Sequence, residues 1–259
     1  MLKSYVSVQL SNESTAKIRE ISFSEFKSLC KLLYTDDSRE LENSFDSLIK
    51  EICLTPLEQI NVLDKFLIIL ASRNTTLGNE LLIKYKDRSV NLNLSRFLDI
   101  QQPTIEIDGM LFSPPINFNT ADTYSLLVNC FKEYKGVNVS NFTYKQKEEI
   151  VNNLNISLKN FINMFVERIK EKNITIYKDL IINFFMPSNL IDFLKLIYYE
   201  NIQDIIQFEY TLKRDLRLNS SDFMYYTYPE LKILYNYYLS DTNAGENSGS
   251  YSGDLSPGS

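Results

Sequence analysis

Histidine and tryptophan are missing from this chain of 259 residues, and glycine is rare. Histidine is the side chain that most often transfers protons near neutral pH, and it is also the commonest metal ligand. Gly78, Gly109 and Gly136 are the only glycines before residue 245, and isolated glycines do not form a phosphate-binding loop. The sequence therefore predicts no catalytic residues, no metal site, no cofactor and no small-molecule substrate.

The chain has three cysteines, Cys30, Cys53 and Cys130, which lie far apart and include no Cys-x-x-Cys pair. Because a free cysteine packs as a small hydrophobic residue, we expect buried, reduced thiols in a reducing cytoplasm. The amino-terminal residues lack the charged-then-apolar layout of a secretory signal. No apolar run reaches the roughly 18–20 residues of a membrane-spanning helix, so we expect no transmembrane segment.

Acidic residues outnumber basic ones, and the formal net charge is −6. Nonspecific nucleic-acid binding needs clustered lysine and arginine that release phosphate counterions, so we expect no nucleic-acid partner. Hydrophobic residues make up 44% of the chain and charged residues 23%, which are ordinary values for a protein that folds. This balance fits a soluble protein that docks on other proteins.

Apolar residues recur with a helical period through most of the chain and with a period of two in its middle. Four capping boxes mark expected helix starts: Ser22 to Glu25, Thr55 to Glu58, Thr143 to Gln146 and Thr227 to Glu230. Alternation from Leu81 to Leu94 predicts one hairpin, and the pair Asp108-Gly109 predicts a tighter one. The sequence predicts an α+β fold that is predominantly α-helical, with small antiparallel β-hairpins in the middle of a helical body.

The pattern also predicts how the chain is divided. We expect residues 1–118 to form an N-terminal segment of three helices and β-hairpins. Residues 119–240 should form a C-terminal helical segment, in which one helix opens at Thr120 or Asp122, carries Phe131 and stops at Gly136. The two segments should pack into one body. Residues 241–259 are rich in Gly, Ser and Asn and are expected to be a disordered tail.

The stretch from Thr55 to Gly78 combines a helix-start signature with a long apolar face and the acid–base pair Asp64-Lys65. Adjacent residues on a helix point about 100° apart, so these two side chains cannot pair with each other. Two interpretations remain open: surface charges beside an apolar stripe, or ion pairs with another segment or a partner. Other paired carboxylates, at Asp36-Asp37, Glu40/Glu42 and Glu148-Glu149, are better explained as helix caps and solvated faces than as acid–base catalysts.

Tyrosine and phenylalanine gather in the last third of the chain, for example at Phe184-Phe185, Tyr198-Tyr199 and Tyr237-Tyr238. Consecutive aromatic residues on a helix cannot all face one core. They indicate either a tyrosine-rich core with hydrated hydroxyls or a protein-binding surface, since tyrosine is enriched in interfaces. Base stacking would need more positive charge nearby than Lys213, Arg214 and Arg217 supply.

Several segments together resemble one family of proteins from tailed bacteriophages. They are SFSEFKSLCKLLY (22–34), Leu57 to Ile83, VNLNLSRFL (90–98), the stretch 183–212 around Pro187, and FMYYTYPELKILYNYYL (223–239). Taken together they are similar to the T4-type baseplate hub family, which includes a hub subunit and a hub assembly factor. The likeness spans nearly residues 1–240, and its most specific part is the block with Asp64, Lys65 and Phe66, followed by Arg73 and Gly78.

The resemblance implies a non-enzymatic structural or assembly protein that acts at the central hub of a contractile tail, with other baseplate and hub proteins as partners. It would be found in the host cytoplasm during assembly and, if incorporated, in the virion tail baseplate. The sequence leaves open which of these roles applies. Candidate docking residues are Asp64, Lys65, Phe66, Arg73, Gly78, Pro187, Tyr198, Tyr210, Thr227, Pro229 and Glu230.

Two other functions remain as alternatives. A soluble phage or bacterial enzyme that works without histidine, through carboxylates or Ser and Lys, would need a concave pocket with convergent polar groups. The other alternative is a membrane-adjacent assembly chaperone.

Overall fold

The computed structural model describes residues 4–11, 13–32, 34, 38–57, 60–85, 88–117, 122–154, 156–178, 180–198, 200 and 202–248. This part of the chain is rich in helix and contains small antiparallel sheets of two to four strands, which confirms the predicted α+β class. The chain opens with the hairpin β1 (Tyr5–Gln9) and β2 (Thr15–Arg19). Three helices follow: α1 (Phe23–Leu32), α2 (Ser38–Ile52) and α3 (Val62–Leu77).

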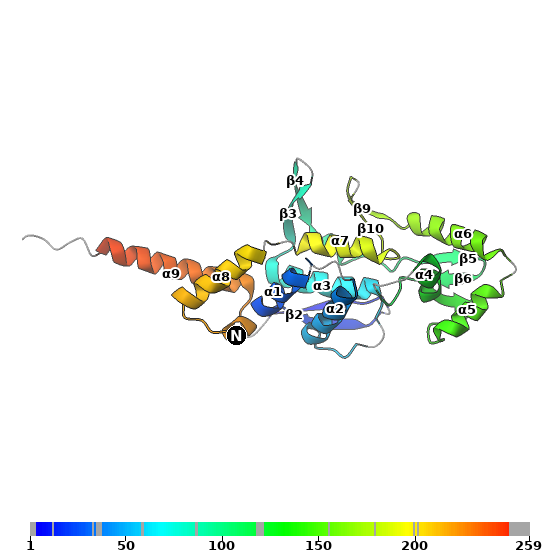
Figure 1. Ribbon diagram of the computed structural model, residues 1–259, viewed down its shortest axis with the longest axis horizontal. Helices are drawn as coiled ribbons and strands as arrows, with labels where there is room; N and C mark the ends of the chain where they lie inside the picture. The colour runs from blue at the N-terminus through cyan, green and yellow to red at the C-terminus, as the bar shows by residue number, and fades with distance from the viewer. Residues whose placement is uncertain are drawn as a thin grey trace, which may run out of the picture.

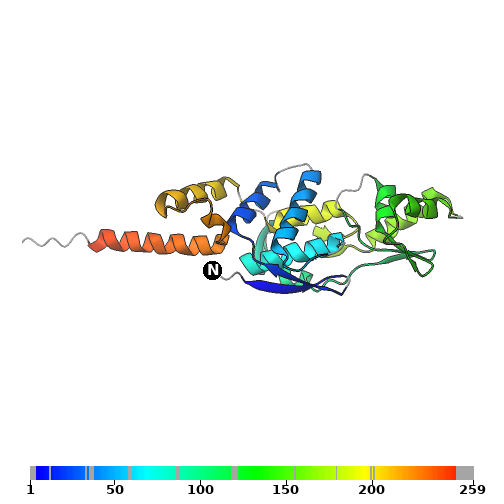
Figure 2. The same ribbon diagram turned by 90° about the horizontal axis from the view of Figure 1, so that it is seen from below.

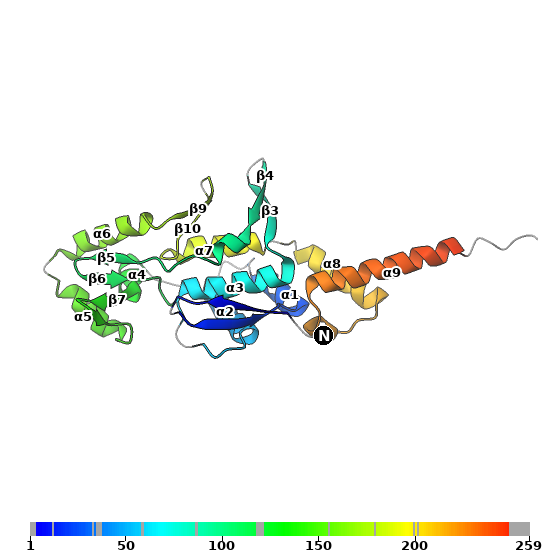
Figure 3. The same ribbon diagram turned by 180° about the vertical axis from the view of Figure 1, so that it is seen from behind.

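Helix α3 lies at the centre of the first hydrophobic core. It contacts α2 and both strands of the β1–β2 hairpin, which lies along it in Figure 3. Nearly the whole helix is buried, from Val62 to Arg73, and Thr76 is buried as well. A helix that is apolar around most of its circumference needs neighbours on every side, and the rest of the first core supplies them.

The helix start predicted at Thr55 is wrong, because α3 begins seven residues later. Asn61 caps it: the Asn61 Oδ1 accepts the N–H of Asp64 at 3.0 Å, and the Asp64 carboxylate accepts the N–H of Asn61 at 3.2 Å. The Thr55 Oγ1 instead accepts the Lys17 N–H at 2.9 Å, beside the hairpin. The partner expected for Thr55, Glu58, and the expected cap pair Asp36-Asp37 lie outside the described residues.

The other three capping boxes form as predicted. They pair Ser22 with Glu25, Thr143 with Gln146 and Thr227 with Glu230. The hairpin predicted after Gly78 is also confirmed, as β3 (Glu80–Tyr85) and β4 (Arg88–Asn93), and the short helix η1 (Leu94–Phe97) follows it.

The second hairpin is the start of a larger sheet. Strands β5 (Ile105–Ile107) and β6 (Met110–Phe112) are joined by Asp108 and Gly109, both at positive φ as a two-residue primed turn requires. Strands β7 (Phe131–Tyr134) and β8 (Val137–Asn138) extend the sheet in the order β5-β6-β7-β8. The prediction that Phe131 continues a helix is therefore wrong. Helix α4 (Thr123–Cys130) ends one residue earlier, because pairing with β6 takes up the backbone that follows.

This sheet and three helices enclose a second core. The helices are α4, α5 (Tyr144–Asn152) and α6 (Leu158–Lys170). The core residues run from Ile105 to Ile169 and include Phe185. The chain returns through β9 (Ile174–Tyr177) and β10 (Leu180–Ile182) to α7 (Pro187–Ile197), which packs in the first core. The second core is thus inserted into the first, and the division expected at residue 118 falls inside it.

The chain closes with α8 (Ile202–Asp215), the short helix η2 (Asp222–Met224) and α9 (Tyr228–Ser248). Helix α9 projects from one end of the molecule, at the opposite end from the second core (Figures 1 and 2). It continues eight residues past residue 240, so the tail expected from 241 begins within a helix; residues 249–259 lie outside the described part. Within the described ranges, neither α9 nor another helix combines the length and apolarity needed to cross a bilayer.

Because the molecule has two separate hydrophobic cores, we expect a cavity-forming substitution in one core to leave the packing of the other unchanged. Phe112 is fully buried in the second core, where its ring lies 5.0 Å from the ring of Phe165 and 5.6 Å from that of Phe131. Phe112→Ala should lower the local stability by about 3–5 kcal/mol. Native-state hydrogen exchange should show lost protection in residues 105–170 while the amides of α3 stay protected.

Phe66→Ala is the matched variant, because Phe66 is fully buried in the first core. It should lower protection in α3 and α7. Equal loss of protection across both cores in either variant would show that they unfold as one unit.

Candidate docking surface

Asp64, the first of the predicted docking residues, lies inside the molecule. It is 2% exposed. Besides capping α3, its carboxylate accepts the Ser11 backbone N–H at 2.7 Å and the Ser11 hydroxyl at 2.9 Å. Asp64 therefore ties the turn of the β1–β2 hairpin to the start of α3.

Lys65 is also buried and forms an ion pair within the chain. Its Nζ lies 2.7 Å from the Asp46 Oδ1 and 3.9 Å from the Glu42 Oε1, both on α2. Of the two interpretations left open by the sequence, the ion pair is the one found. Its partner is a neighbouring helix of the same chain.

Phe66 and Tyr198 are core residues. The Phe66 ring lies 5.3 Å from that of Phe184 and 5.7 Å from that of Phe193. Tyr198 is 1% exposed, and its hydroxyl donates to the Ile69 carbonyl of α3 at 2.9 Å. Burial raises the pKa of Tyr198 well above its ordinary value, so the hydroxyl stays a hydrogen-bond donor.

Arg73 and Gly78 meet at the C-terminal ends of two helices. The buried Arg73 guanidinium donates to the Ile197 carbonyl at the end of α7, at 3.2 Å, and to the Gly78 carbonyl just after α3. A cation is favourable there because the carbonyl ends of helices carry partial negative charge. Burial lowers the pKa of Arg73. Gly78 ends α3 at a φ of 85°, which favours glycine.

The late motif Thr227, Pro229 and Glu230 forms the start of α9. The Thr227 N–H donates to the Glu230 carboxylate at 2.7 Å, and Thr227 is buried, whereas Pro229 and Glu230 are half-buried. Pro187 is the first residue of α7; its side chain lies outside the described part.

These positions correct the predicted docking site. Asp64, Lys65, Phe66, Arg73, Tyr198 and Thr227 are buried, and the hydrogen bonds and ion pairs of their polar groups are made within the chain. A partner cannot reach them without opening the core. Tyr210 is different, because it is 59% exposed on α8.

Tyr210 belongs to a set of exposed large side chains on the last two helices and the segment between them. We call this set the α8–α9 surface; its members are Ile206, Tyr210, Met224, Tyr225, Ile233, Leu234, Tyr237 and Leu239. Where exposed apolar side chains adjoin in one patch, they mark an interaction site. The sequence indicated the tyrosines of this surface, but gave no signal that Ile206, Ile233 or Leu234 would stay uncovered.

Helix α9 has one packed side and one open side. On the packed side Leu231 is fully buried, and the Tyr235 ring lies 6.0 Å from the Phe208 ring of α8. Ile233 and Tyr237 are four residues apart and so share a face. They are 54% and 68% exposed. The first turns of α9 are thus packed on one side and open to solvent on the other.

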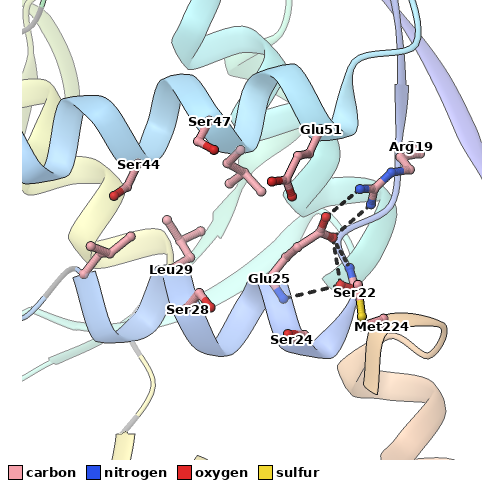
Figure 4. A pocket seen from close by; sticks show the side chains of 12 residues that line it. Arg19, Ser22, Ser24, Glu25, Ser28, Leu29, Ser44, Ser47, Glu51 and Met224 are labelled. Atoms are coloured by element: carbon pink, nitrogen blue, oxygen red, sulfur yellow. Dashed lines mark hydrogen bonds and ion pairs between the residues drawn. The ribbon is translucent and has the colours of Figure 1, made fainter. Parts of the chain in front are cut away.

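The α1–α2 pocket is a hollow between α1 and α2, beside the start of α1. It has a volume of about 420 Å³, and Figure 4 shows Arg19, Glu25 and Glu51 together at one end. The rest of the lining mixes serines with apolar side chains: Ser22, Ser24, Ser28, Leu29, Leu32, Ser44, Ser47, Leu48 and Met224.

Within this pocket the two carboxyl groups are shifted in opposite directions. Burial alone would raise the pKa of Glu25, but hydrogen bonds from Arg19 and Ser22 outweigh it and lower the pKa to about 2. Partial burial and the nearby charge of Glu25 raise the pKa of Glu51. Two carboxyl groups with well-separated pKa values are what general acid–base catalysis requires. However, Glu25 is already bound by the Arg19 guanidinium at 2.9 Å and by the Ser22 hydroxyl at 2.8 Å, which fixes the start of α1.

Comparisons with protein-family models, with curated proteins and with solved structures gave no match. The family resemblance of the sequence therefore stays a prediction.

The burial of Asp64 predicts a loss of stability on its removal. Asp64→Ala leaves the Ser11 N–H, the Ser11 hydroxyl and the Asn61 N–H without their acceptor. The free energy of unfolding should fall by about 2–4 kcal/mol, measured by urea denaturation. Asp64→Asn keeps one oxygen and should lose less. An alanine variant as stable as the wild type would contradict the internal role.

The low pKa of Glu25 predicts a pH-dependent contribution. A carboxyl with a folded pKa of about 2 and an ordinary value of 4.5 stabilises the fold above pH 4.5, and this stabilisation disappears as the pH falls through 2. Glu25→Gln should therefore lower the melting temperature at pH 7 and have little effect near pH 2. Glu51→Gln is the matched control: its pKa is raised, so its removal should slightly raise the melting temperature at neutral pH. If the melting temperatures of the wild type and Glu25→Gln differed by the same amount at every pH, the low pKa assigned to Glu25 would be contradicted.

Proposed function

We propose that this chain is a non-enzymatic structural or assembly protein that acts at the baseplate hub of a contractile phage tail through protein–protein contacts. The observation that carries the proposal is the α8–α9 surface, where large apolar and tyrosyl side chains stay exposed; its α9 members, such as Ile233 and Tyr237, lie on the helix that projects from the body (Figure 1). Tyrosine and aliphatic side chains together are typical of the cores of protein interfaces.

The anchoring of α9 supports this role. The Thr227 cap, the buried Leu231 and the contact of Tyr235 with Phe208 fix the first turns of the helix against the body. A surface that is already ordered loses less conformational entropy on binding than a flexible segment does. The exposed face is therefore suited to a stable contact.

The hub assignment itself rests on the sequence resemblance. Its segments fall on α1, on α3 with β3, on β4 with η1, on α7 with α8, and on η2 with α9. These elements belong to the first core and its projecting end, and Phe185 is the one second-core residue within the quoted segments. That the resembling segments pack into one body supports treating them as a unit.

An acid–base enzyme is the second candidate, and the α1–α2 pocket is the observation that favours it. Its two carboxyls have oppositely shifted pKa values beside several serines. We prefer the structural role because the Glu25 carboxylate is already engaged in the cap of α1. Turnover of a small compound by the purified protein, abolished in Glu51→Gln, would reverse this preference.

The proposed function is tested with charges on the open face of α9. Wild-type protein should be found by mass spectrometry beside hub proteins in purified virions or in assembly intermediates. Ile233→Asp combined with Tyr237→Asp should lower that incorporation by about tenfold or more, since a lost interface hot spot costs about 2 kcal/mol or more. The melting temperature should not change, because both residues are exposed.

Leu158→Asp combined with Met164→Asp is the matched control. These residues are also large, apolar and exposed, but they lie on α6 at the far end of the molecule. The control should incorporate as the wild type does. Absence of the wild type from virions and intermediates alike, or normal incorporation of the α9 variant, would contradict the proposal.

A further inference from the structure

Strand β1 has one edge that is not paired. The Leu10 N–H donates to the Ser14 carbonyl at 2.8 Å, and the Ser4 carbonyl accepts the Glu20 N–H at 3.3 Å. Backbone groups alternate in direction along a strand, so the even-numbered residues of β1 face β2. The N–H and C=O groups of Tyr5, Ser7 and Gln9 therefore point to the other edge. In the ranges that the structure describes, no strand pairs there.

A slot runs along this open edge. It is lined on one side by residues 6–11 and on the other by residues 98–102, and Leu63 and Leu67 of α3 form its floor. Its volume is about 690 Å³, within the range of roughly 300–1,000 Å³ that is usual for binding pockets. Leu63 and Leu67 line this slot together with residues of β1, and β1 packs on α3. A strand in the slot would extend the hairpin sheet over α3.

The charge of the slot indicates what could enter it. Its charged lining residues are Glu13 and Asp99, both acidic. The chain as a whole carries a net charge of −6. Opposite charges across an interface speed association and fix orientation, so a basic segment is the complementary one.

We propose that this slot receives an extended, positively charged segment of a partner protein, which adds to the free edge of β1 as a third antiparallel or parallel strand. Main-chain hydrogen bonds to Ser7 and Gln9, which line the slot, would supply affinity, and alternate side chains would supply specificity. Apolar side chains would face Leu63 and Leu67, and basic ones would lie near the acidic residues of the lining.

A second copy of this chain does not fit the slot as well. In each copy, residues 98–102 form the wall opposite β1, so the β1 edges of two folded copies cannot approach each other closely. A single extended segment can enter between the walls. The proposal also does not depend on the α8–α9 surface, which lies on other elements.

The test uses a fluorescein-labelled synthetic peptide of alternating valine and lysine as the probe, with fluorescence anisotropy as the readout. Ser7→Pro removes the outward N–H of β1 but leaves its bonds to β2, and proline is tolerated on a strand edge. This variant should bind the probe about tenfold more weakly or worse, with an unchanged urea midpoint. Glu13→Gln combined with Asp99→Asn should weaken binding and reduce its dependence on salt.

Two controls keep the outcome decisive. The same peptide with an N-methyl group on every backbone nitrogen has no N–H to donate from either edge, so it should not pair with β1 and should not bind. The variant with Ile233→Asp and Tyr237→Asp changes only α9 and should bind the probe as the wild type does. Loss of hub incorporation in that variant can therefore be distinguished from loss of binding in the slot. If Ser7→Pro lowers the urea midpoint, Gln9→Pro replaces it, because Gln9 faces the same edge.

Three results would overturn the proposal. They are failure of the wild type to bind the probe more tightly than the proline variant does, equal binding of the N-methylated peptide, and equal binding of a peptide of alternating valine and glutamate. The first two exclude strand addition, and the third excludes a basic partner.

Discussion

A helix buried around most of its circumference must satisfy within the protein every charge it carries, and α3 carries three. An uncompensated buried charge costs several kcal/mol. Asp64 is satisfied by Ser11 of the first hairpin, Lys65 by Asp46 of α2, and Arg73 by the carbonyl ends of α3 and α7. Each charge therefore requires a particular segment at a particular place along the helix. The apolar surface of α3 favours burial in general, whereas these polar contacts select which neighbours cover it.

The need to pair these buried charges within the protein explains why the sequence alone predicts Asp64, Lys65 and Arg73 as docking residues. In sequence, an acid–base pair inside an apolar stretch is compatible with solvated surface charges, with an internal ion pair and with a partner contact. The groups that decide between these are remote: Ser11 is 53 residues from Asp64, and Ile197 is 124 residues from Arg73. Periodicity and spacing carry no information over such separations. Asp64, Lys65 and Phe66 do make polar and aromatic contacts, as expected for an acid, a base and an aromatic residue, but the groups that they contact belong to the same chain.

Features set by neighbouring residues were predictable, and features set by distant pairing were not. The Asp108-Gly109 turn and three of the four capping boxes depend on residues within four positions of each other, and they formed as predicted. Thr55 lost its predicted role because its hydroxyl bonds the first hairpin, so Asn61 became the cap. Phe131 lies in strand β7 and not in a helix, because its backbone pairs with β6. The insertion of one core within another leaves no local trace at all, since both cores use the same residue types.

The exposed surface and the buried helix are connected through the root of α9. Tyr228 is buried there, and its ring stacks on those of Phe23 and Phe26 at 5.8 and 5.1 Å. The Phe23 N–H also donates to the Tyr226 carbonyl at 2.7 Å. Helix α9 is thus fixed on α1, whose own start is held by Arg19 through Glu25. Because aromatic stacking and hydrogen bonds restrain the root, force or binding at the open face is transmitted to the body rather than absorbed by a loose joint. Such a restrained root would suit the proposed docking role, in which α9 would hold a partner at a fixed angle to the body.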